Sequence, residues 1–371
     1  MPTILVGTTK GAFLADGETG AVRGPFCHGW PINHVVADRG TGTIFAAGGN
    51  DFFGSGVFRS GDGGETWTLA KFSKGQMDDW FAGDPETAAM FGWTPVAPLF
   101  EGVDAIWSLH AAHGRVWAGA KPANLYVSDD GGETWAINDA FAGFEGRDTW
   151  GGGAAGLVLH SLVTDPGIPK KMWLGVSAEG VFATEDGGGS WSRRNRLSNA
   201  EACEGHDHPA APRDGEIGHC VHNIARASDG RLYQQNHHGV WRSRDEGRSW
   251  DDVTAGLPST FGFPIGVHPT DPDMIWTIPL NGDSQGRFPP DAKPAVWRSR
   301  DGGDSWEACR EGLPARGWFT VLRQAMAVHA GATPEVWFGT NTGSLFVSRD
   351  AGETWEEPVR HLPTVLSVET L

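Results

Sequence analysis

One eight-residue pattern recurs six times and constrains the fold of this chain more than any other feature. The pattern has the form Ser-x-Asp-x-Gly-x-Thr-Trp, and its copies occupy residues 60–67, 128–135, 184–191, 243–250, 299–306 and 348–355. The closing tryptophans of successive copies lie 49 to 68 residues apart. A recurrence at this spacing predicts a repeat architecture, in which each unit buries its apolar face against its neighbours.

Each copy of the pattern lies among short apolar or alternating segments that are typical of β-strands. In the first repeat these segments are 34–37, 43–48 and 57–59, and a return strand follows the tryptophan. The Asp-x-Gly centre favours a hairpin turn, because aspartate bonds nearby backbone amides and glycine accepts positive φ. Four antiparallel strands per repeat, arranged in a ring, predict an all-β fold, the β-propeller.

The two ends of the chain supply the strands of one more blade. Segments 4–7 and 11–14 resemble second and third strands without a first strand, and segment 364–368 is a strand without a repeat of its own. Pairing the N- and C-terminal strands completes a seventh blade and removes two exposed sheet edges. We therefore expect one seven-bladed domain over residues 1–371.

Charge and composition exclude several classes of partner. The 371 residues include 29 Lys and Arg against 46 Asp and Glu, giving a net charge of −17. This balance argues against nucleic acid and against an anionic membrane surface. No apolar run is long enough for a membrane helix, the first residues lack the basic region of a signal peptide, and four cysteines make no disulfide framework. We expect a cytoplasmic protein.

Long connections between blades predict where ligands bind. The loops 68–105, 136–157 and 192–220 join the outer strand of one blade to the inner strand of the next, on what we call the upper face. Loops of this length are uncommon without a function. We expect them to bring ligand-binding side chains to the channel mouth, together with the shorter loops there; the candidates are Trp107, Trp150, Lys10, Lys121, His237 and Gln324. For the tryptophans, the alternative is that each fills a small core of its own loop.

Three histidines share one position on the innermost strands. Aligning the repeats on their turns groups His34, His160 and His222 with Trp107, Phe263 and Gln324. Three converging imidazoles would hold a divalent metal (Zn, Mn, Fe or Cu) that activates water. The alternative is a polar, water-filled channel, and an alignment error of one residue would turn all three side chains away.

The loop before the innermost strand of the fifth blade, 192–220, is rich in metal-ligating and acidic residues. It contains Cys203, His206 and His208, with Glu204 and Asp207 between them. We expect Glu204 and Asp207 to be the catalytic carboxyl groups, because general acid–base chemistry needs such groups beside the ligand. A structural zinc in this loop and a pH-sensitive surface are the alternatives.

The repeat resembles the Asp box, or BNR repeat, of the sialidase superfamily, a motif that xyloglucanases, sortilin-type receptors and photosystem II assembly factors share. The resemblance implies that the boxes are turns on the blade periphery, away from the ligand face. Sialidase activity is not expected, because Tyr126 and Tyr233 both lie on predicted strands and not in the late-chain loop where the family places its nucleophile.

Two functions follow from these features. The first is a hydrolase-like, metal-assisted enzyme that acts on a small polar or glycan-like substrate in a His-rich, Trp-walled pocket of the upper face. The second is a non-catalytic binding or assembly scaffold that docks a protein or peptide on the same face. An enzyme needs a closed pocket with convergent side chains, whereas a scaffold needs an exposed patch.

Overall fold

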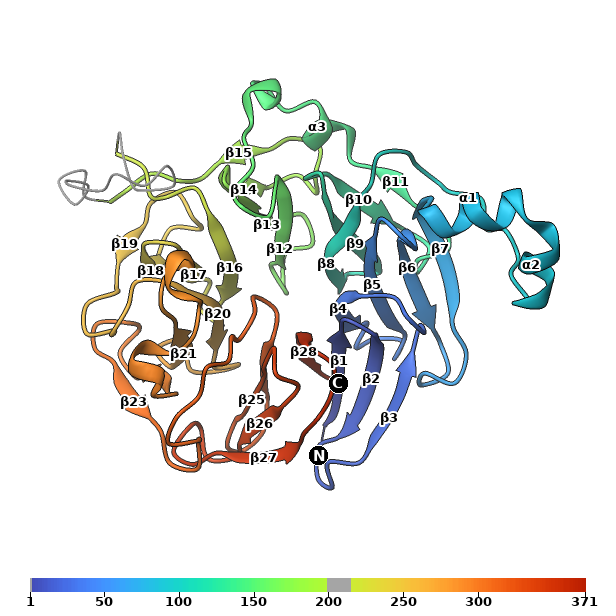
Figure 1. Ribbon diagram of the computed structural model, residues 1–371. Helices are drawn as coiled ribbons and strands as arrows, with labels where there is room; N and C mark the ends of the chain where they lie inside the picture. Colours follow the sequence, from blue (N-terminus) through green and yellow to red (C-terminus); the bar gives the residue numbers. More distant parts are fainter. Residues whose placement is uncertain (1, 199–214) are drawn as a thin grey trace.

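The chain forms a ring of seven four-stranded antiparallel sheets around a central channel (Figure 1). This computed structural model describes residues 2–198 and 215–371. One strand of each sheet lies beside the channel and three follow outward, so the predicted seven-bladed propeller is confirmed.

The blades follow one another along the chain, and the strands of each are named from the innermost outward. The first blade consists of β28 (Val365–Thr370), β1 (Thr3–Thr8), β2 (Gly11–Asp16) and β3 (Val22–Phe26). The second consists of β4 (Ile32–Ala37), β5 (Ile44–Asn50), β6 (Gly54–Ser60) and β7 (Thr68–Ser73). The third consists of β8 (Ala105–Ala112), β9 (Arg115–Lys121), β10 (Leu125–Ser128) and β11 (Ala136–Ile137). The fourth and fifth are β12 (Val158–Thr164), β13 (Met172–Ser177), β14 (Gly180–Thr184) and β15 (Ser192–Arg193); β16 (Val221–Arg226), β17 (Leu232–Asn236), β18 (Gly239–Ser243) and β19 (Asp251–Asp252). The last two are β20 (Gly262–Val267), β21 (Ile275–Pro279), β22 (Val296–Ser299) and β23 (Glu307–Cys309); β24 (Met326–His329), β25 (Glu335–Gly339), β26 (Leu345–Ser348) and β27 (Glu356–Val359).

The first blade closes the ring with strands from both ends of the chain. Strand β28 pairs antiparallel with β1, with Ile4 opposite Thr370 and Val6 opposite Val368. Two backbone hydrogen bonds extend the ladder between residues 3 and 371, at 2.9 and 3.2 Å. The closure predicted from the orphan C-terminal strand is therefore confirmed.

Each repeated octapeptide is a self-bonded turn between the third and fourth strands. In the copy that begins at Ser60, the backbone N–H of Gly64 donates to the Ser60 hydroxyl, which donates to Asp62. The amide and hydroxyl of Thr66 also donate to the Asp62 carboxylate. These hydrogen bonds hold the pKa of Asp62 well below its ordinary value of 3.8. The turn is therefore built from local interactions, as its sequence predicts.

Arginines on the third strands tie neighbouring blades together through these turns. Arg298, on β22, is 1% exposed and donates to the carbonyl of Ala351 in the next blade's turn at 2.7 Å. Its guanidinium also pairs with Glu307 and with Glu353, each at 2.7 Å. Arg242 makes the same kind of contact with the turn of the sixth blade. The repeat thus joins blades as well as turning each of them.

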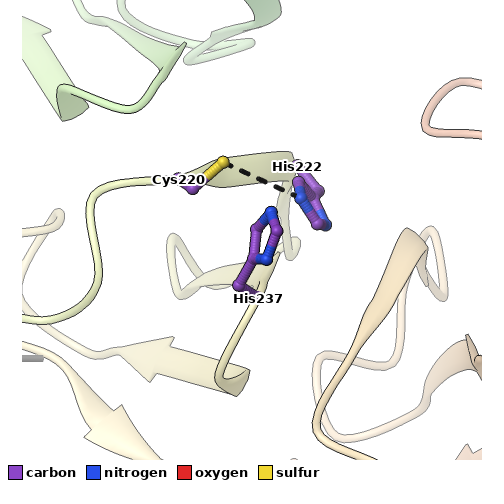
Figure 2. Close-up of side chains that lie close together, drawn as sticks. All are labelled: Cys220, His222 and His237. Atoms are coloured by element: carbon purple, nitrogen blue, oxygen red, sulfur yellow. Dashed lines mark hydrogen bonds between the residues drawn. The ribbon is translucent and has the colours of Figure 1, made fainter. Parts of the chain in front are cut away.

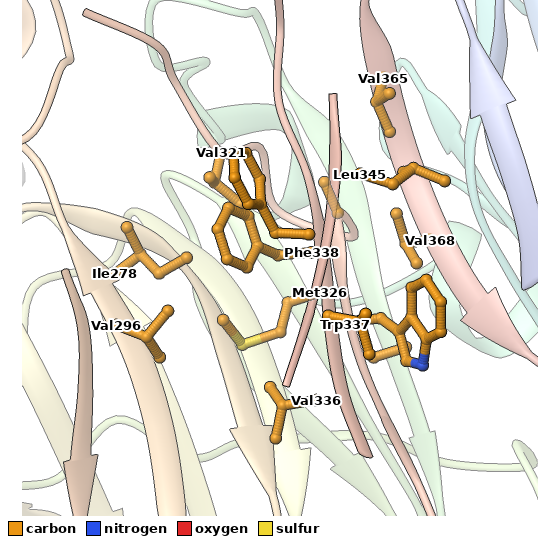
Figure 3. Close-up of a cluster of buried hydrophobic side chains, with 14 of the residues drawn as sticks. Ile278, Val296, Val321, Met326, Val336, Trp337, Phe338, Leu345, Val365 and Val368 are labelled. Atoms are coloured by element: carbon orange, nitrogen blue, oxygen red, sulfur yellow. The ribbon is translucent and has the colours of Figure 1, made fainter. Parts of the chain in front are cut away.

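The hydrophobic core is divided among the interfaces between blades. Figure 3 shows the largest cluster, in which Ile278 of the sixth blade, Phe338 of the seventh and Val368 of the first pack together. Similar clusters lie between the other neighbouring blades. Each blade is therefore stabilised by burial against its neighbours.

Short helices interrupt the loops of the upper face. Helices α1 (Gln76–Gly83) and α2 (Pro85–Met90) project outward beyond the second blade, and α3 (Asp139–Ala142) lies over the third and fourth (Figure 1). Single 3₁₀ turns occur at Arg147–Thr149, Asp283–Gln285 and Pro290–Ala292. Among the described residues, no helix has the length and apolar character needed to cross a bilayer.

Candidate functional site at the channel mouth

A β-bulge near the upper end of the innermost strand positions the side chains around the channel. The strand pairing skips a residue at this point in six blades, and the skipped residues are Asn33, Trp107, His160, His222, Phe263 (with Pro264) and Leu366. A bulged residue leaves the ladder and re-aims its side chain. Five of these six positions line one cavity at the channel mouth.

This upper cavity has a volume of about 280 Å³ and receives side chains from all seven blades. Trp107 and Phe263 supply aromatic surface, and Ala154 and Ala155 of the 136–157 loop contribute to the wall. Ser177 and Gln324 add polar groups. A concave site with apolar walls and a few convergent polar groups is the usual form of a small-molecule site.

The cationic side chains of the upper cavity outnumber its acidic ones. Arg287 and Arg323 line it together with Asp283, the only carboxylate among its described lining residues. Asp283 pairs with Arg287 at 2.6 Å, whereas no ion pair of Arg323 is found in the described part of the chain. The Arg323 guanidinium lies 4.7 Å from the centre of the Phe263 ring. Burial lowers the pKa of Arg323 to about 10, which leaves it cationic at neutral pH.

Cys220, His222 and His237 form a cluster in the wall of the upper cavity (Figure 2). One potential ligand atom from each lies within 4.8 Å of the others, and Cys220 Sγ is 4.0 Å from His222 Nε2. The Nδ1 of His222 is 2.5 Å from the carbonyl oxygen of Gly262. His222 is 1% exposed and Cys220 is 4% exposed.

A second, lower cavity of about 770 Å³ occupies the channel below the bulges. It is lined by His34, His110, His160 and Glu369, and Gln324 lies on the boundary between the two cavities. Burial lowers the pKa of His110 to about 4, although the charge of Glu369 opposes this shift. Burial also holds the pKa of His160 well below 6.5.

The predicted three-histidine centre is not formed. Nδ1 of His34 accepts the backbone N–H of Leu109 at 2.9 Å, and Nε2 lies 3.4 Å from Glu369 in the lower cavity. The bulge falls on Asn33 in this blade, so the alignment that grouped His34 with the other positions is shifted by one residue. Among the described residues, the three-residue group close enough to share a metal contains only His222 of the predicted set.

The other predicted site residues divide between the channel and its surroundings. Trp107, His237 and Gln324 line the upper cavity. Lys121 lines an adjoining groove of about 450 Å³, which shares Trp107 with that cavity. Lys10 is exposed and lines neither cavity.

Trp150 belongs to the core of its own loop. The centre of its ring lies 5.0 Å from that of Phe182 and 5.7 Å from that of Phe141. The Arg147 guanidinium lies 4.7 Å from the centre of the Trp150 ring. This packing corrects the prediction that Trp150 faces a ligand. Glu204 and Asp207 lie outside the described residues.

The charged groups of the upper cavity were not predicted from the sequence. Asp283 and Arg287 come from the long loop between β21 and β22, and Arg323 precedes the Gln324 position by one residue. The length of that loop was the available signal for the first two. Nothing in the repeat distinguishes Arg323 from other loop arginines.

Comparison with known proteins agrees with the turn geometry. The model of the BNR/Asp-box repeat family matches residues 126–136, which include most of β10 and the octapeptide of the third blade. The same hydrogen bond, from the first hydroxyl to the aspartate, recurs in the copies that begin at Ser60, Ser128, Thr184, Ser243, Ser299 and Ser348. The chain is a seven-bladed propeller with a match to the BNR/Asp-box repeat.

Individual relatives of this Asp-box propeller are distant. The oligoxyloglucan-reducing end-specific xyloglucanase of Emericella nidulans is 23% identical over 266 residues, which cover 62% of this chain and 30% of the xyloglucanase. The propeller therefore spans less than a third of that relative.

Two solved structures share the fold. A GH74 enzyme of Niastella koreensis superposes with a TM-score of 0.61 at 14% identity, over 97% of this chain and 52% of the enzyme. YCF48 bound to a D1 peptide superposes with a TM-score of 0.52 at 16% identity, over 88% of this chain and 83% of YCF48.

Proposed function

We propose that this propeller is a hydrolase-like enzyme whose upper cavity binds a small, glycan-like molecule that carries an anionic group. The observation that carries the proposal is Arg323, a cation in the cavity wall without a carboxylate partner in the described ion pairs. Its Nε is buried and has no hydrogen-bond partner among the residues that the structure describes. An unpaired buried charge costs several kcal/mol, and an anionic ligand offsets that cost through charge-assisted hydrogen bonds.

The aromatic walls support a ring-bearing ligand. Trp107 lines the same cavity, and its buried indole N–H has no hydrogen-bond partner within residues 2–198 and 215–371. Buried indole N–H groups usually find an acceptor, and aromatic faces suit the apolar side of a sugar ring. The similarity to the Emericella nidulans xyloglucanase also supports a glycan-like class.

The chemical step is proposed as general acid–base hydrolysis. Glu204 and Asp207 remain our candidates for the acid and the base, and Asp283 is the carboxylate that lines the cavity. Glycoside hydrolysis commonly uses two carboxyl groups on opposite sides of the scissile bond. Because Asp283 is paired with Arg287, we assign it to ligand positioning.

Calorimetric titration with matched sugars tests the ligand class. Glucuronate should bind more tightly than glucose, and Arg323→Gln should weaken glucuronate at least about tenfold through loss of a charged hydrogen bond. Arg316→Gln, at an exposed arginine of the same loop, is the matched control. Equal binding of both sugars, or an unchanged affinity in Arg323→Gln, would contradict the proposal. Hydrolysis of aryl glycosides and aryl glucuronides then tests the reaction.

A second candidate function, a peptide-binding scaffold, rests on the outward helices. On α1 and α2 and just beyond them, Trp80, Met90 and Phe91 are 51%, 80% and 68% exposed. Exposed apolar patches often mark protein interaction sites, and YCF48, which shares the fold, is seen with a D1 peptide.

Peptide selection separates the two functions. If the protein is a peptide-binding scaffold, peptides selected on the immobilised wild-type protein should not bind the Met90→Glu/Phe91→Glu variant and should still bind Arg323→Gln. Peptides that bind the Met90→Glu/Phe91→Glu variant as well as the wild type would contradict the scaffold function.

A further inference from the structure

The upper cavity contains a cluster of metal-ligating side chains that the proposed anion site does not use. We propose that Cys220, His222 and His237 bind one zinc-class divalent cation, with an open coordination position that faces the cavity. The proposal goes beyond the ligand proposed above and stands without it, because it depends on these three side chains alone.

The spacing of the three side chains fits a transition metal after a small contraction. Their ligand atoms all lie within 4.8 Å of one another, and the Cys220 Sγ to His222 Nε2 distance is 4.0 Å. With Zn–S near 2.3 Å and Zn–N near 2.0 Å, the ligands of a tetrahedral zinc lie roughly 3.3–3.6 Å apart. Side-chain movements of about 1 Å would therefore close the site.

The surroundings orient the imidazole of His222. His222 Nδ1 is 2.5 Å from the Gly262 carbonyl oxygen, which can only accept a hydrogen bond, so this nitrogen carries the proton. Nε2 then presents its lone pair toward Cys220 (Figure 2). His237 Nδ1 lies 3.9 Å from Asp283 Oδ2, which is beyond hydrogen-bond distance. A carbonyl partner such as that of His222 fixes the tautomer of a metal-binding histidine.

The fold brings the three residues together from one blade. Cys220 directly precedes β16, His222 is the bulged residue of that strand, and His237 directly follows β17. The site thus lies at the adjoining ends of two paired strands, which anchor the backbone of all three residues.

The donor set selects the metal class. One thiolate and two imidazoles favour zinc, cobalt or copper over magnesium and calcium, which prefer oxygen ligands. Three protein ligands also leave one tetrahedral position free. All three residues line the upper cavity, so that position opens toward a bound water or an oxygen of the ligand.

Cobalt substitution tests the site. Chelator-treated protein is titrated with Co²⁺ and followed by the near-ultraviolet sulfur-to-cobalt charge-transfer absorption, which reports a thiolate ligand. We expect about one cobalt per chain, displaced by Zn²⁺. Cys220→Ser should abolish the charge-transfer absorption, and His237→Asn should weaken cobalt binding at least about 100-fold.

Matched cysteine variants make the result specific. Cys309→Ser alters another buried free cysteine, on β23, and should leave cobalt binding unchanged. Absence of the absorption in the wild-type protein would overturn the site. The site would also be overturned if the charge-transfer absorption persisted in Cys220→Ser and disappeared in Cys203→Ser, because the thiolate ligand would then be Cys203. If circular dichroism shows that Cys220→Ser does not fold, His237→Asn decides: unchanged cobalt affinity refutes the proposal.

Discussion

Replacing His160 with leucine should make the protein less sensitive to acid. His160 is 1% exposed, and neither ring nitrogen has a hydrogen-bond partner in the described structure. Burial and the nearby charge of Arg323 hold its pKa well below the ordinary value of 6.5. The unfolded chain therefore binds a proton that the folded chain rejects, and stability falls as the pH drops below about 6.5.

The size of this effect follows from the pH interval. Between about pH 6.5 and pH 5, one such histidine lowers the free energy of unfolding by about 2 kcal/mol, at roughly 1.4 kcal/mol per pH unit. His110, whose pKa is lowered to about 4, should contribute a similar loss in the same interval. Asp62 and Asp130 have lowered pKa values, so their stabilisation is lost only as the pH falls through about 4 and below. The interval above pH 5 thus isolates the histidines.

Urea unfolding at about pH 7.5 and about pH 5 measures the difference. His160→Leu should lose about 2 kcal/mol less than the wild type between the two conditions. At the higher pH it should be at least as stable, because an unbonded buried polar group is removed. His28→Leu, at an exposed position, should lose as much free energy of unfolding between the two pH values as the wild type does. If His160→Leu and the wild type lose the same free energy, the reasoning is refuted.

Three further changes probe the ring and its surface. Arg298→Met should lower the free energy of unfolding by about 2–3 kcal/mol in urea titrations, because the variant lacks the hydrogen bonds of the buried guanidinium. The control is Arg300→Met, at an exposed arginine that pairs with the same two glutamates, and it should cost less than about 1 kcal/mol. Val368→Ala, in the closing strand, should cost about 2 kcal/mol, and a similar cost from a surface valine would argue against the closure. Phe91→Glu should change the midpoint of thermal unfolding little, because the ring is 68% exposed; a large loss would mean that the helices support the ring.

The repeat made most of the fold predictable. The octapeptide turn is stabilised by its own serine and aspartate, so its sequence specifies its structure without help from distant residues. The strand alternation around it then determines the blade, and the unpaired segment at the C-terminus indicates the closure.

The walls of the cavity depended on features that a repeat does not encode. A bulge inserts one residue without changing the apolar alternation on either side, which is why His34 was expected where Asn33 lies. Arg323 reaches the cavity from an irregular loop, whose path depends on packing against neighbouring blades. Trp150 illustrates the reverse case, since the long loop that carries it needed an apolar core of its own.

The antiparallel pairing of β28 with β1 also determines how the ring responds to force. Residues 3 and 371 lie at the same end of this two-strand ladder, where two backbone hydrogen bonds join them. A load applied across these residues would fall on that last pair first and then on each following pair in turn. The blade would open like a zipper and not by shear, so a ring that is held together at many interfaces would yield to a modest pull at this one seam.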